Sequence, residues 1–399
     1  MAACCRPFDS VTEPPAGDDE SKNAKLIIVD RYYIVTGDLH LERAQYGLPI
    51  RHQDNQQCVE AILRDGCTNP QCLGVILTGD TFHRKSLLPK YQIQLQGIAQ
   101  RVNKAGKAFL AIDGNHDGSD ASWLDTVSPE INADGRVVKL GEIAAAFFSF
   151  QPRDKLYERI KALPENTRCL FLHGRLLELM AWAAHVPEPE YDFSAEELRE
   201  LGLKNCTVFL GNLHTYSDFH DPVGKNWFVY SGSTEMTEIS EGNIVSDRFG
   251  GRYDPVKKYL RFYPNREHGQ NWETVDLPNR PYLRRVISPE EDAELAVQSV
   301  DHWVEKHPGG ILALHYPEGL RANLKPHLPR WREKLLVFSE VPLSRGMAKP
   351  LHDMKESDIL EIAQKELTER QLQLLAVVLT QEPFDQTLSG LLKLPEKPA

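Results

Sequence analysis

The chain has 399 residues, of which 41% are hydrophobic and 26% are charged, as is ordinary for a globular protein of two or three domains. Its formal net charge of −11 argues against broad, unaided nucleic-acid binding through a basic surface, although bound metals or a partner would offset it. No apolar run approaches the roughly 20 residues that span a bilayer, and no signal-peptide pattern is present. We therefore expect a cytoplasmic protein with no membrane partner.

The beginning of the chain has the composition of a tail. Residues 1–24 are rich in Pro, Asp, Glu and Ser and have few apolar positions, so we expect them to be disordered. Apolar strands are predicted over residues 26–29 and 32–36. Asp38 and His40 follow the second strand, two positions apart on a turn, so both side chains can hold one cation.

The next elements alternate between helix and strand. Apolar residues recur at helical spacing over residues 54–64 and 92–104, and an apolar strand is predicted between them over residues 73–78. This order predicts parallel strands joined by right-handed crossovers, with the helices covering the sheet. The strand runs into Asp80, whose two carboxylate oxygens can bridge two cations.

The strand predicted over residues 107–112 ends in the tetrapeptide Gly-Asn-His-Asp. Asn115 can give a metal its carbonyl oxygen, while His116 can stay off the metal and deliver a proton. Asp117 can fix the tautomer and orientation of that ring. Such a tetrapeptide can equally be an ordinary polar turn, so its meaning depends on the other strand ends.

Two later strands also end in possible metal ligands. Residues 168–172 lead into His173, and residues 207–210 lead into Asn212 and His214. Open α/β sheets place their sites at the carboxyl ends of their strands. Because every donor found so far stands at a strand end, we expect these side chains to converge on one site.

The remaining segments of this half of the chain are assigned to supporting structure. Two strands of a second sheet are predicted over residues 137–139 and 144–150, and two helices over 153–162 and 193–202. Residues 257–263 and 272–275 are predicted to be paired strands. We expect His220, just past the last donor, to lie on a surface loop.

The donors suit a centre of two metal ions. The first ion is assigned Asp38, His40 and His214, the second is assigned Asn115 and His173, and Asp80 bridges them. Oxygen and imidazole ligands without a thiolate suit Mn²⁺, Fe or Zn²⁺. Two ions about 3.5–4 Å apart can activate a water and stabilise an in-line displacement at phosphorus. His116 is then the candidate acid for the leaving oxygen.

The order Asp-x-His, Gly-Asp, Gly-Asn-His-Asp, His and Gly-x-x-His resembles the calcineurin-like metallophosphoesterase superfamily. Within it, residues 26–240 are similar to the SbcD-type nuclease subunit of the SbcCD double-strand-break complex, phage recombination nucleases included. That family has a Gly-Asp-x-Phe-His motif whose His contacts the scissile phosphate, which implies this role for His83. Ser231-Gly232-Ser233 resembles the segment that follows its last metal motif.

The resemblance implies a fold in the α/β class: a metallophosphoesterase β-sandwich flanked by helices, a small α+β capping domain and C-terminal helices. We expect four parts in chain order. They are a tail over 1–24, a metallophosphoesterase nuclease domain over 25–278, a DNA-binding capping domain over 279–341, and a linker with a helical, partner-binding segment over 342–399.

Patterns in the last third of the chain agree with this division. Strands are predicted over residues 282–287, 310–315 and 334–338, and helices over 289–306 and 320–325. Residues 342–355 are polar, contain two prolines and are predicted to be a linker. Helical patterns follow over 359–363 and 369–379. A terminal apolar helix pair cannot bury itself alone, so it packs either on a partner or back on its own domain.

The resemblance also implies cofactors and partners. They are two Mn²⁺ ions (with Mg²⁺, Fe or Zn²⁺ as alternatives), DNA as substrate, an SbcC-type ABC ATPase bound by the C-terminal helices, and a homodimer. The chain has no Walker-type phosphate-binding loop, so any use of ATP falls to the partner. Arg84 and Lys85, beside His83, are either DNA-phosphate ligands or part of a solvated loop.

One position departs from the family pattern. The last motif there is usually Gly-His-x-His, with both imidazoles on metal, whereas Asn212 replaces the first His here. An amide oxygen is a weaker donor to a transition metal than imidazole, which predicts a loosely held second ion and a preference for added Mn²⁺. Two rival functions remain open: a phosphatase or phosphodiesterase on a non-DNA substrate, and a non-catalytic scaffold for DNA ends.

Substitution Asn212→His should tighten binding of the second metal ion, because it restores an imidazole ligand. Calorimetric titration of Mn²⁺ into the wild type and the variant measures this directly. Binding of the first ion serves as the internal control. Equal second-site affinities in the two proteins would refute the assignment of Asn212.

Overall fold

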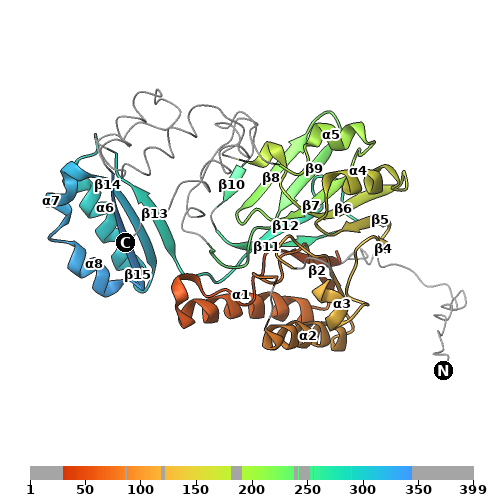
Figure 1. The fold of residues 1–399 in the computed structure, drawn as a ribbon, viewed down its shortest axis with the longest axis horizontal. Helices are drawn as coiled ribbons and strands as arrows, with labels where there is room; N and C mark the ends of the chain where they lie inside the picture. The colour runs from red at the N-terminus through yellow and green to blue at the C-terminus, as the bar shows by residue number, and fades with distance from the viewer. Residues whose placement is uncertain are drawn as a thin grey trace, which may run out of the picture.

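The computed structural model describes residues 30–85, 88–117, 122–180, 191–237, 241, 252–254, 256–288 and 290–343. These residues form two packed sheets with outer helices and a second lobe beside them (Figure 1). The expected tail over 1–24, the strand over 26–29 and the helices after residue 355 lie outside the described residues. Within the described ranges, no helix has the length and apolar character needed to cross a membrane.

The first sheet has five strands in the order β12-β11-β1-β2-β3. Their bounds are Tyr32–Thr36 for β1, Cys72–Leu77 for β2, Ala108–Ala111 for β3, Lys258–Phe262 for β11 and Trp272–Asp276 for β12. As predicted, β1, β2 and β3 are parallel, and β11 and β12 pair with each other. The outer face packs on α1 (Pro49–Thr68) and α2 (Pro89–Lys104).

The second sheet has seven strands in the order β10-β8-β9-β7-β6-β5-β4. Their bounds are Val137–Leu140 for β4, Ile143–Phe148 for β5, Thr167–His173 for β6, Thr207–Gly211 for β7, Tyr216–Asp221 for β8, Asn226–Tyr230 for β9 and Arg252–Asp254 for β10. Helices α4 (Arg153–Lys161) and α5 (Ala195–Glu200) pack on its outer face, and the short α3 (Trp123–Val127) lies against α2.

The inner faces of the two sheets form one aromatic core. Phe171 of β6 stacks on Phe209 of β7, with ring centroids 5.3 Å apart, and Phe209 meets Phe262 of β11 edge to face at 5.0 Å. All three rings are fully buried, and such pairs add to the free energy of burial. The predicted α/β class and helix-flanked β-sandwich are confirmed.

One expectation about this sheet is wrong. His220 lies on the strand β8 rather than on a surface loop. Its exposed ring stacks on Trp227 of the neighbouring strand, with centroids 4.5 Å apart. The segment 218–221 is polar, so its hydrophobic pattern gave no strand signal; cross-strand pairing with β9 supplies the structure instead.

The second lobe, residues 279–343, is built on a parallel sheet of β13 (Tyr282–Val286), β14 (Ile311–Pro317) and β15 (Val337–Leu343). Three helices accompany it: α6 (Ala293–Lys306), α7 (Arg321–Leu324) and α8 (Leu328–Lys334). The fully buried Trp331 of α8, a helix that the pattern did not predict, packs in its core.

The linker was expected to begin at residue 342, but Pro342 lies in β15. This strand is at the edge of the sheet, where proline is tolerated.

A buried ion network joins this lobe to α1. Asp54 accepts two hydrogen bonds from Arg280, at 2.7 and 2.8 Å, and one from Arg51 at 2.6 Å. Arg51 is 1% exposed and also donates to Glu235 at 3.0 Å, while Arg280 donates to the main chain of Gly309 at 2.8 Å. Asp54 therefore pairs with both guanidinium groups at the junction, and Glu235 supplies a second carboxylate to Arg51.

Substitution Asp54→Asn should lower the free energy of unfolding at pH 7 by about 3–5 kcal/mol, because it leaves two largely buried cations with one carboxylate fewer. Burial raises the pKa of Asp54, but hydrogen bonds from Arg280 and Arg51 outweigh it, so the net pKa lies below the usual value. The stabilisation is therefore present above the unfolded-state value, about 3.9, and is lost as the pH falls through the folded pKa.

Urea denaturation at pH 7 and at about pH 3 measures the effect, and the difference between variant and wild type should shrink at the lower pH. The control is Glu60→Gln in the exposed pair with Arg101, which should cost less than about 1 kcal/mol. Equal losses for the two variants would show that the junction network does not stabilise the fold.

Candidate metal centre

Loops at the carboxyl ends of β1, β2, β3, β6 and β7 bring the predicted donors together. Asp38, His40 and Asp80 adopt positive φ values of 50°, 44° and 49°, a backbone conformation that is unusual for residues other than glycine. The turns are tight enough that a Cβ atom on Gly79 would lie 2.3 Å from the His173 ring. Strain of this kind is characteristic of functional sites.

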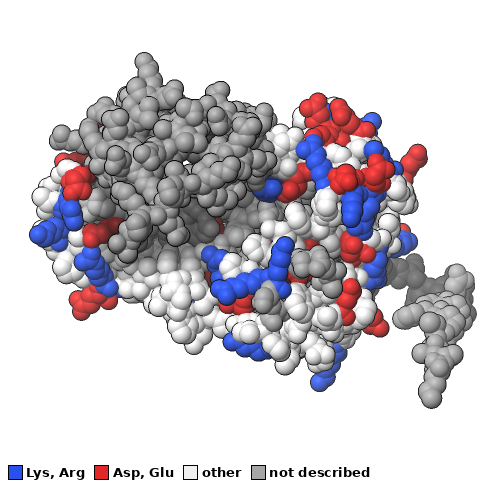
Figure 2. All heavy atoms as spheres, in the orientation of Figure 1, with Lys and Arg blue, Asp and Glu red and all other residues white. Residues whose placement is uncertain are grey.

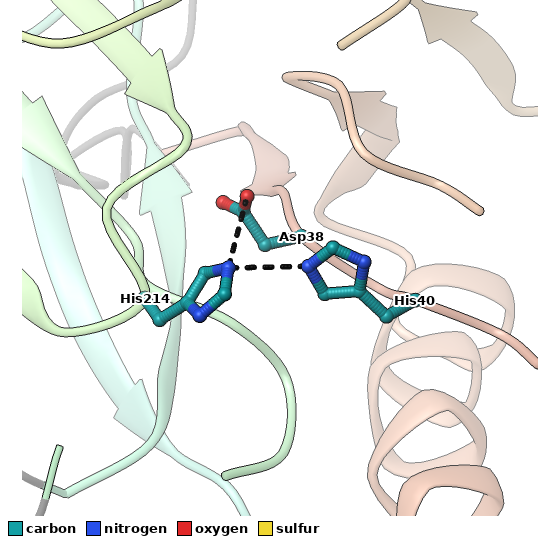
Figure 3. Close-up of side chains that lie close together, drawn as sticks. All are labelled: Asp38, His40 and His214. Atoms are coloured by element: carbon teal, nitrogen blue, oxygen red, sulfur yellow. Dashed lines mark hydrogen bonds and ion pairs between the residues drawn. The ribbon is translucent and has the colours of Figure 1, made fainter. Parts of the chain in front are cut away.

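The first donor group consists of Asp38, His40 and His214 (Figure 3). The two Nε2 atoms of His40 and His214 are 3.1 Å apart, and His214 Nε2 is 3.9 Å from a carboxylate oxygen of Asp38. Asp38 and His40 are 0% and 2% exposed. All three side chains point to one place, as the sequence assignment of the first ion requires.

The second group consists of Asp38, Asp80 and His173. His173 Nε2 is 3.5 Å from Asp80 Oδ1 and 2.9 Å from the side-chain oxygen of Asn115. In this arrangement Asp38 belongs to both groups, whereas the sequence assigned the bridge to Asp80. The two groups are therefore adjacent and share a carboxylate, which is the arrangement that a two-metal centre needs.

The ring nitrogens of this site fit divalent cations. His173 Nδ1 lies 2.9 Å from the carbonyl oxygen of Thr78, which can only accept, so Nδ1 carries the proton and Nε2 presents its lone pair. That lone pair faces another acceptor, the Asn115 oxygen. His214 Nδ1 likewise faces the Glu241 carboxylate at 3.3 Å, which directs its Nε2 lone pair toward His40. Converging acceptors of this kind are stabilised by a cation between them.

Burial sets the charge state of the donors. It lowers the pKa of His40 well below the usual value, and the positive charge that His214 carries when it is protonated lowers this pKa further. The neutral imidazole is the form that binds metal. Burial raises the pKa of Asp38, although His214 and His173 oppose it. A bound cation would favour the ionised carboxylate and offset the cost of burying it.

His116 and His83 stand beside the two donor groups. The side chain of His116 is 41% exposed, its Nε2 is 4.0 Å from Asp80, and its Nδ1 is 2.9 Å from the carbonyl oxygen of His83. The two rings stack with centroids 5.6 Å apart. Arg43 contacts His83 Nε2 at 2.8 Å. Burial, followed by the charge of Arg43, lowers the pKa of His83 to about 4.

Comparison with known proteins agrees with this geometry. Residues 32–223 match the family described as calcineurin-like phosphoesterase. The chain carries a calcineurin-like metallophosphoesterase domain. That match contains every predicted donor, from Asp38 to His214, together with His83, His116 and Asp117.

Proteins similar to this chain include three that are named DNA double-strand break repair protein Mre11. The protein from Methanosarcina mazei is 29% identical over 218 residues, 52% of this chain and 34% of that protein. The protein from Methanosarcina acetivorans is 28% identical over 66% of this chain and 44% of its own length. The protein from Haloferax volcanii is 31% identical over 52% of this chain and 46% of its own length. The matched stretch is thus less than half of each of these three relatives.

In this phosphoesterase domain Asp117 has a different contact from the one predicted. Its carboxylate, 1% exposed, accepts main-chain N–H groups of Thr81 at 3.1 Å, Phe82 at 2.7 Å and Gly114 at 2.8 Å. The predicted contact with the His116 ring is replaced by the carbonyl oxygen of His83. Asp117 therefore holds the two loops of the phosphoesterase site together rather than the ring itself.

Asn212 contributes a main-chain group that the sequence did not reveal. Its N–H is 3.1 Å from each carboxylate oxygen of Asp38, so it helps to orient the carboxylate shared by the two groups. Its φ of 104° is one that asparagine tolerates better than most residues. The ligand role of its side-chain oxygen stays a prediction.

Sequence reasoning missed the groups behind His214. Thr237 Oγ1 is 2.6 Å from His214 Nδ1, and Glu241 approaches the same nitrogen. Lys257 forms an ion pair with Glu241 and donates to the carbonyl oxygen of His214 at 2.7 Å. Burial raises the pKa of Glu241, but the charge of Lys257 and contacts with His214 outweigh it, so the carboxyl is ionised. These residues follow the last motif and form no pattern that would have identified them.

Substitution Asp38→Asn should abolish the rise in melting temperature that Mn²⁺ produces in the wild type, because it removes the carboxylate common to both groups. The melting temperature without metal should not fall, since burial raises the pKa of Asp38 and its charge opposes folding at neutral pH. Differential scanning calorimetry with and without Mn²⁺ tests both statements.

The control for this experiment is Asp221→Asn, which alters a buried carboxylate at the end of β8 that binds main-chain N–H groups outside the site. It should keep the full Mn²⁺-dependent shift even if it melts earlier. A normal Mn²⁺ shift in Asp38→Asn would remove this carboxylate from the metal centre.

Proposed function

We propose that the protein is a two-metal phosphodiesterase that cleaves DNA ends, as exonuclease and endonuclease, in repair or recombination. The observation that carries this proposal is the pair of adjacent donor groups that share Asp38, in which imidazole nitrogens and carboxylate oxygens converge. The DNA substrate is supported by similarity to proteins named for double-strand break repair. The phosphoesterase domain supports hydrolysis at phosphorus.

Seven side chains would hold two Mn²⁺ ions, or Mg²⁺, Fe or Zn²⁺ in their place: Asp38, His40, Asp80, Asn115, His173, Asn212 and His214. When bound, the ions would supply Lewis acidity toward the phosphate oxygens and an activated water. The protein contributes buried carboxylates that offset their charge and rings whose tautomers are set by Thr78 and Glu241. These contacts prearrange the site before substrate arrives.

His116 is the proposed general acid. Its exposed ring can reach a substrate, and the His83 carbonyl oxygen holds its Nδ1–H, so that a protonated ring presents Nε2–H to the leaving oxygen. His83 is the proposed contact to the scissile phosphate, and Arg43 beside it adds positive charge. Asp117 is a positioning residue, because it ties the loop of His83 to that of His116.

The wider organisation belongs to the same proposal. We assign the nuclease domain to 25–278, a DNA-gripping capping domain to 279–343, and binding of an SbcC-type ABC ATPase to the segment after residue 343, with a homodimer as the working unit. On the face drawn in Figure 2, acidic and basic side chains are intermixed, and no basic band crosses the described residues. The formal net charge of −11 agrees with weak DNA binding by the chain alone and with a partner that supplies basic surface.

Substitution His116→Ala should reduce cleavage of end-labelled linear duplex DNA in Mn²⁺ by about 10²–10⁴-fold, the usual contribution of a general acid. The assay is run with and without the cognate ATPase. The matched control is His220→Ala, which removes an exposed ring on β8 and should leave the rate unchanged. A small phosphodiester, bis(p-nitrophenyl) phosphate, is assayed in parallel.

The alternatives predict different results. Hydrolysis of the small phosphodiester with no cleavage of DNA, with or without the ATPase, would identify a phosphodiesterase for another substrate. DNA binding without cleavage of either substrate would identify a non-catalytic scaffold for DNA ends. Equal rates for wild type and His116→Ala would remove His116 as the acid.

A further inference from the structure

The Nδ1 atoms of the site histidines are held in place, with one exception. Nδ1 lies 2.9 Å from a main-chain carbonyl oxygen in both His116 and His173, and 2.6 Å from Thr237 Oγ1 in His214. His40 Nδ1 is buried and has no hydrogen-bond partner among the described residues. A metal-binding imidazole almost always donates its second N–H to an acceptor, so the contact that orients His40 is incomplete.

A side chain of α1 has a buried acceptor that lacks a donor among the described residues. Asn55 is 4% exposed, and its Nδ2 donates to the main-chain oxygen of Leu39, the residue before His40, at 2.8 Å. Its Oδ1 is buried and has no partner within the described part of the chain. Such an acceptor costs about 1–3 kcal/mol when it stays unsatisfied, so a partner for it is expected.

His40 and Asn55 line the same small cavity, together with Arg43, whose Nε is also buried and lacks a partner among the described residues. The cavity volume is about 10 Å³, which is roughly the space that the centre of one water molecule needs. A buried water requires two to four polar partners, and these three residues supply two donors and one acceptor.

We infer that Asn55 positions His40 through one buried water molecule. The water accepts hydrogen bonds from His40 Nδ1–H and from Arg43 Nε–H, and it donates one to Asn55 Oδ1. This arrangement keeps the proton of His40 on Nδ1 and directs the lone pair of Nε2 toward His214, across the first donor group (Figure 3). The inference rests on the proposed role of His40 as a metal ligand and adds a positioning residue to that site.

The direct test is a crystal structure of the full chain at a resolution that shows ordered water. We expect one water within about 3.2 Å of both His40 Nδ1 and Asn55 Oδ1, the limit of a good hydrogen bond. An empty cavity, or a direct contact between the two side chains, would overturn the inference whether or not metal is bound.

Calorimetric titration of Mn²⁺ tests the consequence for metal binding. Asn55→Leu should lower the affinity for the ion bound by His40 about 10- to 100-fold, as is usual when a residue that hydrogen-bonds a metal ligand is lost. Asn55→Asp keeps the acceptor but loses the donor to Leu39, so it should bind within about threefold of the wild type. If Asn55 acted only as a brace for Leu39, both variants would weaken binding equally, which would overturn the inference.

Asn279→Leu is the matched control. Asn279 also donates Nδ2 to a main-chain oxygen, that of Thr234 at 2.9 Å. Its Oδ1 is likewise buried and has no partner among the residues that the structure describes, but Asn279 does not line the cavity. Its Mn²⁺ affinity should equal that of the wild type. If Asn55→Leu binds Mn²⁺ as tightly as the wild type, the role of Asn55 is refuted but the metal centre is not. If the wild type binds no Mn²⁺, the proposed metal centre is refuted, and the crystal structure alone then tests for the buried water.

Discussion

The arrangement of the site depends on the contact between the inner faces of the two sheets. Asp38 and Asp80 follow strands of the five-stranded sheet, whereas His173 and His214 follow strands of the seven-stranded sheet. Neither sheet alone holds a complete donor group. The buried aromatic core of Phe171, Phe209 and Phe262 fixes the distance between the sheets and therefore the distance between the donors.

Hydrogen bonds from the surrounding main chain stabilise the buried carboxylates and orient the rings of the site. Carboxylates buried without cationic partners cost free energy, and the fold offsets part of that cost with main-chain N–H groups, as at Asp38 and Asp117. Main-chain carbonyl groups set the tautomers of His173 and His116. These contacts come from loops whose positions follow from strand packing. The packing that stabilises the fold therefore also sets the geometry of the site.

The loop that follows β9 connects the site to the second lobe. Glu235 binds Arg51 in the junction network, while the carbonyl oxygen of Thr237 accepts hydrogen bonds from Arg43 and Gln45. The same Thr237 approaches His214 through its hydroxyl group. A short segment thus contacts α1, a ring of the first donor group and the arginine beside His83, so the position of the lobe and the geometry of the site are physically connected.

The sequence by itself determined the strand ends and the residue types that stand at them. Apolar runs marked β1, β2, β3, β6 and β7, and the polar residues after each run identified Asp38, His40, Asp80, His173 and His214, because strand periodicity and turn chemistry are local properties. The strand β8 escaped detection, since it is polar and is stabilised by pairing with β9. The helix α8 was likewise missed, and it packs through Trp331.

Only the tertiary structure decided which donor group each of these residues joins and which atoms each side chain contacts. It placed Asp38 in both donor groups, transferred Asp117 from the His116 ring to main-chain N–H groups, and brought Glu241 and Lys257 behind His214. It also placed Asn55 beside a buried nitrogen of His40. Contacts between side chains far apart in the chain depend on how sheets and helices pack, and no local pattern of residues encodes that packing.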